Sequence, residues 1–319
     1  MKRNSIFKIV LFASVAMLLF VGCSTTPTTP NEPDVGEMKT VTITDVRGDV
    51  EIPENPERIV DLSGNSDILS ILGYEVIGTA NSDAYDYTRF PSYLQETLEG
   101  ATILGYSMQD TMDIEAVMNL EPDLIIISTV QEKMYDQLSN IAPTVMIQLE
   151  ALDWKEDVKA IGKVFNKLDV AEAWLEDYTA KAKVAGEEIL ESYGENTTYL
   201  SFLASGGQFY VFDGAGFGSV LYEDMELRKP EGMPEQSNIS LPVVTYEGLA
   251  SIKSDYIFVI ATDEDLKVLE ENTIWNNLPS VREGKVIKLG ASPYFNQGYS
   301  SIGREVLLDE IVEMLNETK

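Results

Sequence analysis

Carboxylates are the side chains of this chain with the widest catalytic chemistry, because the sequence contains no histidine. The absence of histidine excludes Ser-His-Asp and Cys-His catalysis, and it excludes histidine ligation of zinc, manganese or haem. Acidic pairs such as Asp110 and Asp113 could still serve as general acid and base. Helix caps and solvated helix faces explain these carboxylates better, so we expect the protein not to be an enzyme.

Two glutamates occupy matching places in a segment that occurs twice. A constant offset of 132 relates Glu115 to Glu247 and Asp123 to Asp255, together with the apolar residues around them. Any helix–turn–strand unit shares apolar spacing, but acidic residues that match at the same offset are harder to attribute to chance. We infer two lobes of similar plan, one in each half of the chain.

Short helices and strands alternate through residues 39–167 and again through residues 195–319. This alternation is typical of α/β lobes with mostly parallel sheets. Ligands of such sheets bind beyond the carboxyl ends of the strands. One wall of a binding site is therefore expected from three loops, Ser63–Asn65, Asn81–Pro91 and Gly105–Gln109.

One long helix is predicted between the halves, in residues 168–194. Asp169 is placed to cap it in a capping box with Glu172, and Gly194 is placed to end it with a left-handed backbone. At about 1.5 Å per residue the helix would extend roughly 37 Å, so we expect it to bridge two Rossmann-like lobes as a stiff strut. Its buried stripe is expected at Val170, Trp174, Tyr178, Ala182, Ala185 and Ile189.

The first 38 residues have the pattern of a leader followed by a tether. Three basic residues precede an apolar block that ends next to Cys23, which is the only cysteine, and the block is short for a transmembrane span. We expect residues 1–22 to be a lipoprotein signal peptide, Cys23 to carry the lipid, and residues 23–38 to be flexible. The alternative is an ordinary signal peptide with a chance cysteine. The protein is then expected on the cell membrane, facing away from the cytoplasm.

The charge balance restricts the partners of the folded part. The formal net charge is −30, and removal of the three leader cations makes the mature chain about −33. With 44% hydrophobic residues the chain can still bury a sizeable core. So negative a surface disfavours nucleic acid, an anionic membrane surface, and any anionic ligand whose site lacks local cations. We expect a monomer without a cofactor of its own.

Several of these features together resemble one family. They are the lipoprotein leader, the helices that carry Glu115 and Glu247, the run Leu138–Val145, and the segment from Asp153-Trp154-Lys155 to Trp174-Leu175. They are similar to the substrate-binding proteins of ABC importers for ferric siderophores, haem and cobalamin, and most like the ferric-siderophore branch. The likeness covers residues 39–319.

The resemblance implies a ligand held between two lobes with little hinge closure. It also implies that Glu115 and Glu247 meet arginines of an ABC permease, which works with an ATPase. Iron is expected only as a siderophore complex, because a siderophore fills the coordination sphere of the metal and leaves no place for a protein ligand.

The resemblance also indicates the ligand contacts. Many relatives place arginines in Gly105–Gln109 and near Gln208–Tyr210, where this chain has Tyr106 and Tyr210 instead. Tyrosine offers a flat apolar face and a hydroxyl, so a neutral or cationic ferric hydroxamate is favoured over an anionic catecholate or citrate complex. Tyr294, Phe295 and Tyr299 are expected in a loop from Ala291 to Ser300. The candidate contacts are Asn65, Tyr85, Tyr87, Arg89, Tyr106, Met108, Gln109, Gln208, Tyr210, Tyr294, Phe295 and Tyr299.

Three other interpretations stay open. Within the same class of proteins, the ligand could be cobalamin, or haem bound through tyrosine or methionine. From different classes, the chain could be an acid/base enzyme on a two-lobed scaffold, or a surface adhesion lipoprotein that has lost transport.

Overall fold

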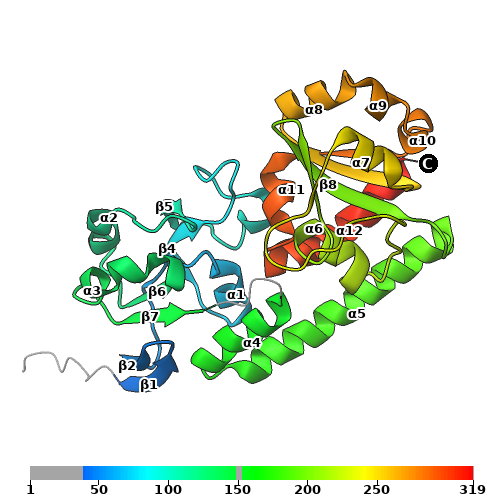
Figure 1. The fold of residues 1–319 in the computed structure, drawn as a ribbon. Helices are drawn as coiled ribbons and strands as arrows, with labels where there is room; N and C mark the ends of the chain where they lie inside the picture. The colour runs from blue at the N-terminus through cyan, green and yellow to red at the C-terminus, as the bar shows by residue number, and fades with distance from the viewer. Residues whose placement is uncertain (1–38, 149–152, 319) are drawn as a thin grey trace, which may run out of the picture. The chain divides into compact units, whose positions relative to one another are not determined.

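The computed structural model describes residues 39–148 and 153–318 (Figure 1). The expected signal peptide, the tether and Cys23 lie outside these residues. The described chain begins with a hairpin, in which β1 (Thr40–Asp45) pairs antiparallel with β2 (Gly48–Pro53). Asp45 fixes the turn, because its Oδ1 accepts from the backbone nitrogens of Arg47 and Gly48 at 2.7 and 3.1 Å.

The first lobe is built on a five-stranded parallel sheet of order β5-β4-β3-β6-β7. Its inner strands β3 and β6 are buried at every position, as expected for parallel strands with both faces covered. The strands are β3 (Ile59–Asp61), β4 (Val76–Asn81), β5 (Thr102–Tyr106), β6 (Leu124–Ser128) and β7 (Thr144–Ile147). The helices are α1 (Ser66–Ile71), η1 (Ser92–Leu94), α2 (Ile114–Asn119), η2 (Thr129–Met134), α3 (Tyr135–Leu138) and α4 (Trp154–Val164).

The second lobe has a mixed sheet of order β10-β9-β8-β11-β12. Its first connection is the tight turn Gly206-Gly207, where both residues have positive φ, and a two-residue turn joins only antiparallel strands. The strands are β8 (Tyr199–Ser205), β9 (Gln208–Val211), β10 (Val243–Val244), β11 (Tyr256–Ala261) and β12 (Val286–Gly290). The helices are α6 (Gly216–Ser219), the π-helix η3 (Val220–Asp224), α7 (Tyr246–Ser251), α8 (Asp263–Glu270), α9 (Thr273–Asn276), α10 (Pro279–Arg282), α11 (Ala291–Gln297) and α12 (Ser301–Glu317).

The sequence repeat corresponds to equivalent structure in the two lobes. Helices α2 and α7 have the same length and are related by the offset of 132. Asp123 accepts from the backbone nitrogens of Glu57 and Arg58 at 2.8 and 2.9 Å, and Asp255 accepts from that of Thr198 at 2.9 Å. Each aspartate therefore fixes the amino end of the central strand beside it, β3 or β8. The expected α/β fold of two similar lobes is confirmed.

Helix α5 (Leu168–Tyr193) is continuous and belongs to the cores of both lobes (Figure 1). Ala171 and Leu175 pack in the core of the first lobe, and the helix continues from Tyr178 to Ile189 along the core of the second. Because the same rigid helix is buried in both cores, it holds the lobes as the strut that the sequence predicts.

Two details of the predicted helix are wrong. Its N-cap is Lys167, so Asp169 lies inside the first turn, and no side-chain capping bond forms at this end. The turn from α4 sets this start, because the backbone nitrogen of Lys167 donates to Gly162 O at 2.7 Å. Val170, expected in the buried stripe, is exposed, and the stripe begins at Ala171. Gly194 does end the helix with a positive φ of 93°.

Gly186 permits the closest packing on the strut. A Cβ at this position would lie 2.1 Å from the carbonyl oxygen of Met225, at the end of η3. Helix propensity alone would favour alanine by about 1 kcal/mol. We expect the clash to dominate, so that Gly186→Ala lowers the free energy of unfolding by about 2–4 kcal/mol in chemical denaturation.

The control for this substitution is Val184→Ala, on the exposed side of the same helix. This variant should stay within about 0.5 kcal/mol of wild type. A Gly186→Ala protein as stable as wild type would show that η3 moves away from the helix at little cost.

Candidate functional site

A cleft of about 520 Å³ is lined by residues of both lobes. The first lobe contributes the loops that follow β3, β4, β5 and β6, and α4 adds Trp154 and Asp157. The second lobe contributes residues next to α6, α11 and α12, with Ile239 and Leu241 from the segment before β10. The cleft thus lies at the carboxyl ends of the first sheet, as the sequence predicts.

Four serines recur along the first wall. Ser63, Ser82, Ser107 and Ser128 stand at or just after the carboxyl ends of four neighbouring strands, and all four line the cleft. Small hydroxyl side chains give the wall neutral hydrogen-bonding groups and leave room for a bulky ligand. Sequence reasoning named the loops but missed this pattern, whose signal is a serine at the end of each strand.

Two buried polar residues hold these serine loops in place. Asp61 accepts from the backbone nitrogen and the hydroxyl of Ser63 at 2.9 and 2.5 Å, and burial raises the pKa of its carboxyl. Gln131 Nε2 donates to the carbonyl oxygen of Ser107 at 2.6 Å, and its Oε1 accepts from Ser128 Oγ at 2.9 Å. Gly64 lets the loops approach, because a Cβ there would lie 2.6 Å from that of Ser107. The wall is therefore preorganised.

The second wall is mainly aromatic and aliphatic. Phe295, Asn296 and Tyr299 line the cleft from the end of the chain segment that the sequence predicted to be a loop. That prediction is wrong for residues 291–297, which form α11 with a non-helical kink at Ser292, and it holds for residues 298–300, which form a turn. Phe295 lies in α11 and Tyr299 in the turn after it, and their ring centres are 6.1 Å apart.

Arg304 is the functional residue that sequence reasoning missed most completely. It lines the cleft from α12, and its guanidinium lies 4.5 Å from the centre of the Trp154 ring. Its nitrogens donate to Asp224 Oδ2 at 2.8 Å and to Ser219 Oγ at 2.7 Å. Among the described residues that line the cleft, no other carries a positive charge. Nothing in the helical pattern distinguishes this buried arginine from one at the surface.

Five of the twelve predicted contacts line the cleft: Asn65, Tyr106, Met108, Phe295 and Tyr299. The other seven do not. Tyr85, Tyr87, Arg89, Gln109, Gln208, Tyr210 and Tyr294 lie outside its lining.

Local contacts explain most of these seven positions. Gln109 Oε1 accepts from the backbone nitrogen of Tyr106, which turns the amide into its own loop. Gln208 and Tyr210 project from the same face of β9, where the Tyr210 hydroxyl donates a hydrogen bond to Gln208 Oε1 at 3.0 Å. Tyr294 packs on the second core, where burial and then Glu310 raise the pKa of its hydroxyl. Tyr87 stacks on Tyr106 at 5.8 Å between ring centres and is exposed outside the lining.

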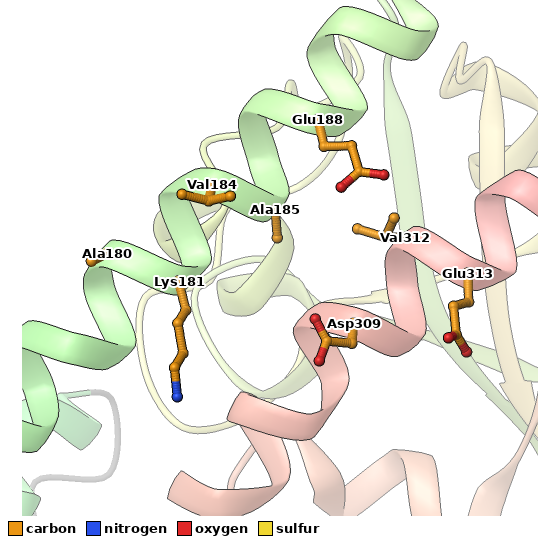
Figure 2. Close-up of a pocket in the computed structure, with 8 residues that line it drawn as sticks. All are labelled: Ala180, Lys181, Val184, Ala185, Glu188, Asp309, Val312 and Glu313. Carbon is orange, nitrogen blue, oxygen red and sulfur yellow. The ribbon is translucent and has the colours of Figure 1, made fainter.

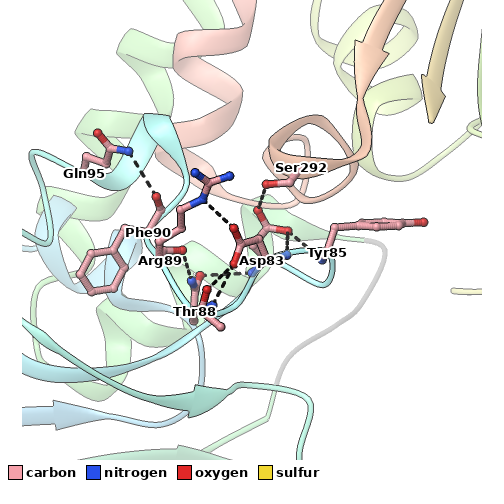
Figure 3. A network of polar contacts seen from close by, with 9 residues as sticks. Asp83, Tyr85, Thr88, Arg89, Phe90, Gln95 and Ser292 are labelled. Carbon is pink, nitrogen blue, oxygen red and sulfur yellow. Dashed lines mark hydrogen bonds and ion pairs between the residues drawn. The ribbon is translucent and has the colours of Figure 1, made fainter. Parts of the chain in front are cut away.

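The remaining two, Tyr85 and Arg89, belong to a loop that crosses from the first lobe to α11 (Figure 3). Asp83 Oδ2 accepts from Ser292 Oγ at 2.5 Å, and the Tyr85 ring packs edge-on against Phe295 at 5.5 Å. Arg89 pairs with Asp86 at 2.6 Å and is exposed. A cation committed to its own loop in this way offers no clamp for a ligand in the cleft.

A second hollow, of about 540 Å³, runs between α5 and α12 (Figure 2). It is an open groove whose lining mixes Lys181 with Glu188, Asp309 and Glu313, and it shares no residue with the lining of the cleft. In residues 39–148 and 153–318, no cluster of three or more acidic or cysteine side chains is placed to hold a metal ion. Across the same residues, no helix combines the length and apolar character that a membrane span requires.

The two matched glutamates are exposed at the starts of their helices. Glu115 is the second residue of α2, which Asp113 caps, and Glu247 is the second residue of α7, which Thr245 caps. Hydrogen bonds from its own backbone nitrogen and from Thr245 lower the pKa of the Glu247 carboxyl. Each lobe therefore presents one carboxylate, held by equivalent local structure.

Comparison with known proteins accords with this geometry. The chain is similar to two iron(3+)-hydroxamate-binding proteins of Bacillus subtilis (strain 168). It shares 28% identity with YxeB, with both chains covered completely, and 31% identity with FhuD, over 76% of each chain.

Among solved structures, the chain is similar to a FhuD-fold component of a Fep/Fec-like ferrichrome ABC transporter from Bacillus subtilis. The TM-score is 0.71 at 28% identity, covering 86% of this chain and 99% of that one. Staphylococcus aureus SirA, complexed with staphyloferrin B, shares the fold with a TM-score of 0.66 at 24% identity, covering 88% and 100%. Residues 63–293 match the family described as periplasmic binding protein. The chain belongs to the periplasmic binding protein family.

Proposed function

We propose that this protein is the extracytoplasmic substrate-binding component of an ABC importer and captures a ferric siderophore of the hydroxamate type. The observation that carries the proposal is the cleft between the lobes, with a neutral serine wall facing an aromatic wall. A ferric hydroxamate has carbonyl and hydroxamate oxygens at its iron end and aliphatic chains around it. Such a complex matches both walls, because hydroxyls can donate to its oxygens and rings can cover its chains.

Charge favours a hydroxamate over an anionic chelate. Arg304 is paired with Asp224, and Asp157 adds a negative charge to the lining, so the cleft has no surplus of cations. An anionic complex would lose hydration there without a compensating partner. The names of the similar Bacillus subtilis proteins, which bind iron(3+)-hydroxamate, support the same ligand class.

The proposal includes the attachment and partners of the protein. Cys23 would carry a lipid, residues 23–38 would tether the lobes to the outer face of the cell membrane, and the protein would work as a monomer. Glu115 and Glu247 would dock on the permease, whose ATPase drives uptake. Asn65, Tyr106, Met108, Phe295 and Tyr299 are the predicted contacts that we retain for the ligand.

Binding to the purified mature chain tests the ligand class. Trp154 lines the cleft, so its fluorescence should be quenched when ferrichrome, a neutral ferric hydroxamate, is added, and much less by a triply anionic ferric catecholate. Native mass spectrometry against ferric siderophores, cobalamin and haem would identify competing ligands. Tighter binding of the catecholate at moderate salt would contradict the proposal, because it requires a cationic clamp.

Two exposed methionines provide a matched pair for the same assay. Met108 lines the cleft, whereas Met118 lies on α2 outside it. Met108→Ala removes apolar contact with the ligand and should weaken ferrichrome binding about 3–10-fold, given roughly 25 cal/mol per Å² of apolar area. Met118→Ala should bind as wild type does.

A further inference from the structure

A buried charge cluster lies behind the Trp154 ring of the cleft wall. Its centre is Asp224, the last residue of η3 and only 7% exposed. The Arg304 guanidinium lies 2.8 Å from Asp224 Oδ2, and Lys155 Nζ lies 2.9 Å from Oδ1. Tyr178 from the strut donates to Oδ2 at 2.8 Å. One carboxylate therefore faces two cations, and it draws together α4, α5, η3 and α12.

Both cations are close enough to the cleft to act on a ligand there. Arg304 is part of the lining, and its Nε is buried without a hydrogen-bond partner among the described residues. Lys155 Nζ lies 5.5 Å from the centre of the Trp154 ring, which also lines the cleft. Charges in such partly desolvated positions act more strongly than charges at an open surface.

Carboxylates balance these two cations. Asp224 contributes one negative charge from within the cluster, and Asp157 contributes another from the cleft lining. Glu223 adjoins the cluster from the exposed side, and the pKa of its carboxyl is raised by desolvation first and by Asp224 second. The charges of Arg304 and Lys155 are therefore balanced by those of Asp224 and Asp157, and this part of the cleft has no net positive charge.

We propose that Asp224 sets the charge selectivity of the cleft. By pairing with both Arg304 and Lys155, Asp224 supplies one of the two negative charges that balance them, and so keeps an anionic ferric chelate from gaining the cationic partner that its binding requires. Neutral complexes, which need no such partner, are left as the preferred ligands. Asp224 acts through Arg304 and is a positioning residue, not a ligand contact. This inference rests on the proposed function, since it concerns the same cleft and the same class of ligand.

The substitution Asp224→Asn tests the proposal on the mature chain. It keeps an oxygen that can accept from Arg304 but removes the negative charge. The ratio of affinities for a triply anionic ferric catecholate and for ferrichrome should rise about tenfold or more, and the gain should shrink at high salt. Adding Arg304→Gln to Asp224→Asn should reverse the gain, which a purely structural effect of Asp224 would not do.

Two further variants keep the test decisive. Asp157→Asn removes one negative charge from the lining and leaves Asp224 itself unchanged, and should raise the same ratio about threefold even if Asp224→Asn does not fold. Asp309→Asn makes the same change in net charge in the groove between α5 and α12, and should leave the ratio unchanged.

The outcomes separate this inference from the proposed function. A wild-type chain that binds neither chelate overturns both. A wild-type chain that binds ferrichrome, with a ratio that neither Asp224→Asn nor Asp157→Asn raises, overturns the inference alone. An equal rise of the affinity ratio in Asp309→Asn also overturns the inference, because the total charge of the protein would then explain the selectivity.

Discussion

Reversing the charge of both matched glutamates, Glu115→Lys with Glu247→Lys, should abolish uptake while leaving ligand binding intact. Each carboxylate is exposed at the start of a helix in its own lobe. On the proposed function, two such charges would make a two-point contact with basic pockets on a two-fold permease, through charge-assisted pairs with arginine. Lysine at both points would bring like charges together. Uptake of radiolabelled iron by cells, and stimulation of the reconstituted ATPase, would measure the loss.

The folding cost of this double variant should be small. A carboxylate near an exposed helix N-terminus contributes only about 0.3–1 kcal/mol, so both changes should reduce stability by no more than about 2 kcal/mol. The matched control is Glu96→Lys with Glu271→Lys, which changes the same charge at one exposed site in each lobe. Normal uptake by the Glu115→Lys, Glu247→Lys protein, together with a much lower melting temperature, would mean that the two glutamates only stabilise the N-termini of their helices.

Removing the carboxylate of Asp67 should destabilise the protein more than any other single truncation that we propose. Asp67 belongs to α1 of the first lobe and is 5% exposed. Its Oδ2 accepts from Ser300 Oγ at 2.7 Å and from the backbone nitrogen of Ser301 at 2.6 Å, at the start of α12 in the second lobe. Asp67→Ala would leave these donors buried and unpaired, at a cost of about 2–5 kcal/mol.

The consequence should extend beyond stability, because Asp67 joins the two lobes. Together with the Asp83–Ser292 bond it forms a second connection beside the strut. Asp67→Ala should therefore increase hydrogen exchange at the start of α12 and widen the distribution of lobe spacings in small-angle scattering. Unchanged exchange at Ser300 and Ser301 would show that the strut alone fixes the lobes.

Asp67→Asn separates the charge from the hydrogen bonds. Burial raises the pKa of the Asp67 carboxyl above its value in the unfolded chain. The stability contributed by this shift is complete at acid pH and is lost as the pH rises through the folded-state pKa. Wild type should therefore gain stability relative to Asp67→Asn as the pH falls below neutral, measured as melting temperature across pH. An opposite slope would mean that hydrogen bonds outweigh burial at this carboxyl.

Much of the architecture could be predicted because it depends on linear properties of the chain. The periodicity of residues 168–194 indicates a helix long enough to join two cores, and the alternation on either side indicates α/β lobes. The offset that relates Glu115 to Glu247 reflects repeated structure, down to the paired roles of Asp123 and Asp255. The loops that follow parallel strands were also identified as a wall of the cleft, because strand direction alone decides where their ends lie.

Other local features were misjudged because neighbouring segments decide them. Asp169 has the residue type and spacing of an N-cap, but the turn from α4 starts the helix at Leu168. The segment after β12 looks like a loop, yet packing against the second core makes it α11. In both cases, several geometries are locally acceptable, and long-range contacts select among them.

Only the tertiary structure decided which side chains form the cleft. Tyr106 lines the cleft, whereas Tyr87 stacks on Tyr106 and does not line it. Phe295 lines the cleft, whereas Tyr294 packs on the core of the second lobe without lining it. Within each pair the residue type is equally suitable, and the direction of the side chain depends on the position of one helix or loop against another. Arg304 and Asp224 are 80 residues apart, so no spacing along the chain announces their pairing. The sequence by itself determined the scaffold and the matched places of Glu115 and Glu247, whereas the charge and shape of the site depend on contacts between distant segments, which only the folded chain brings together.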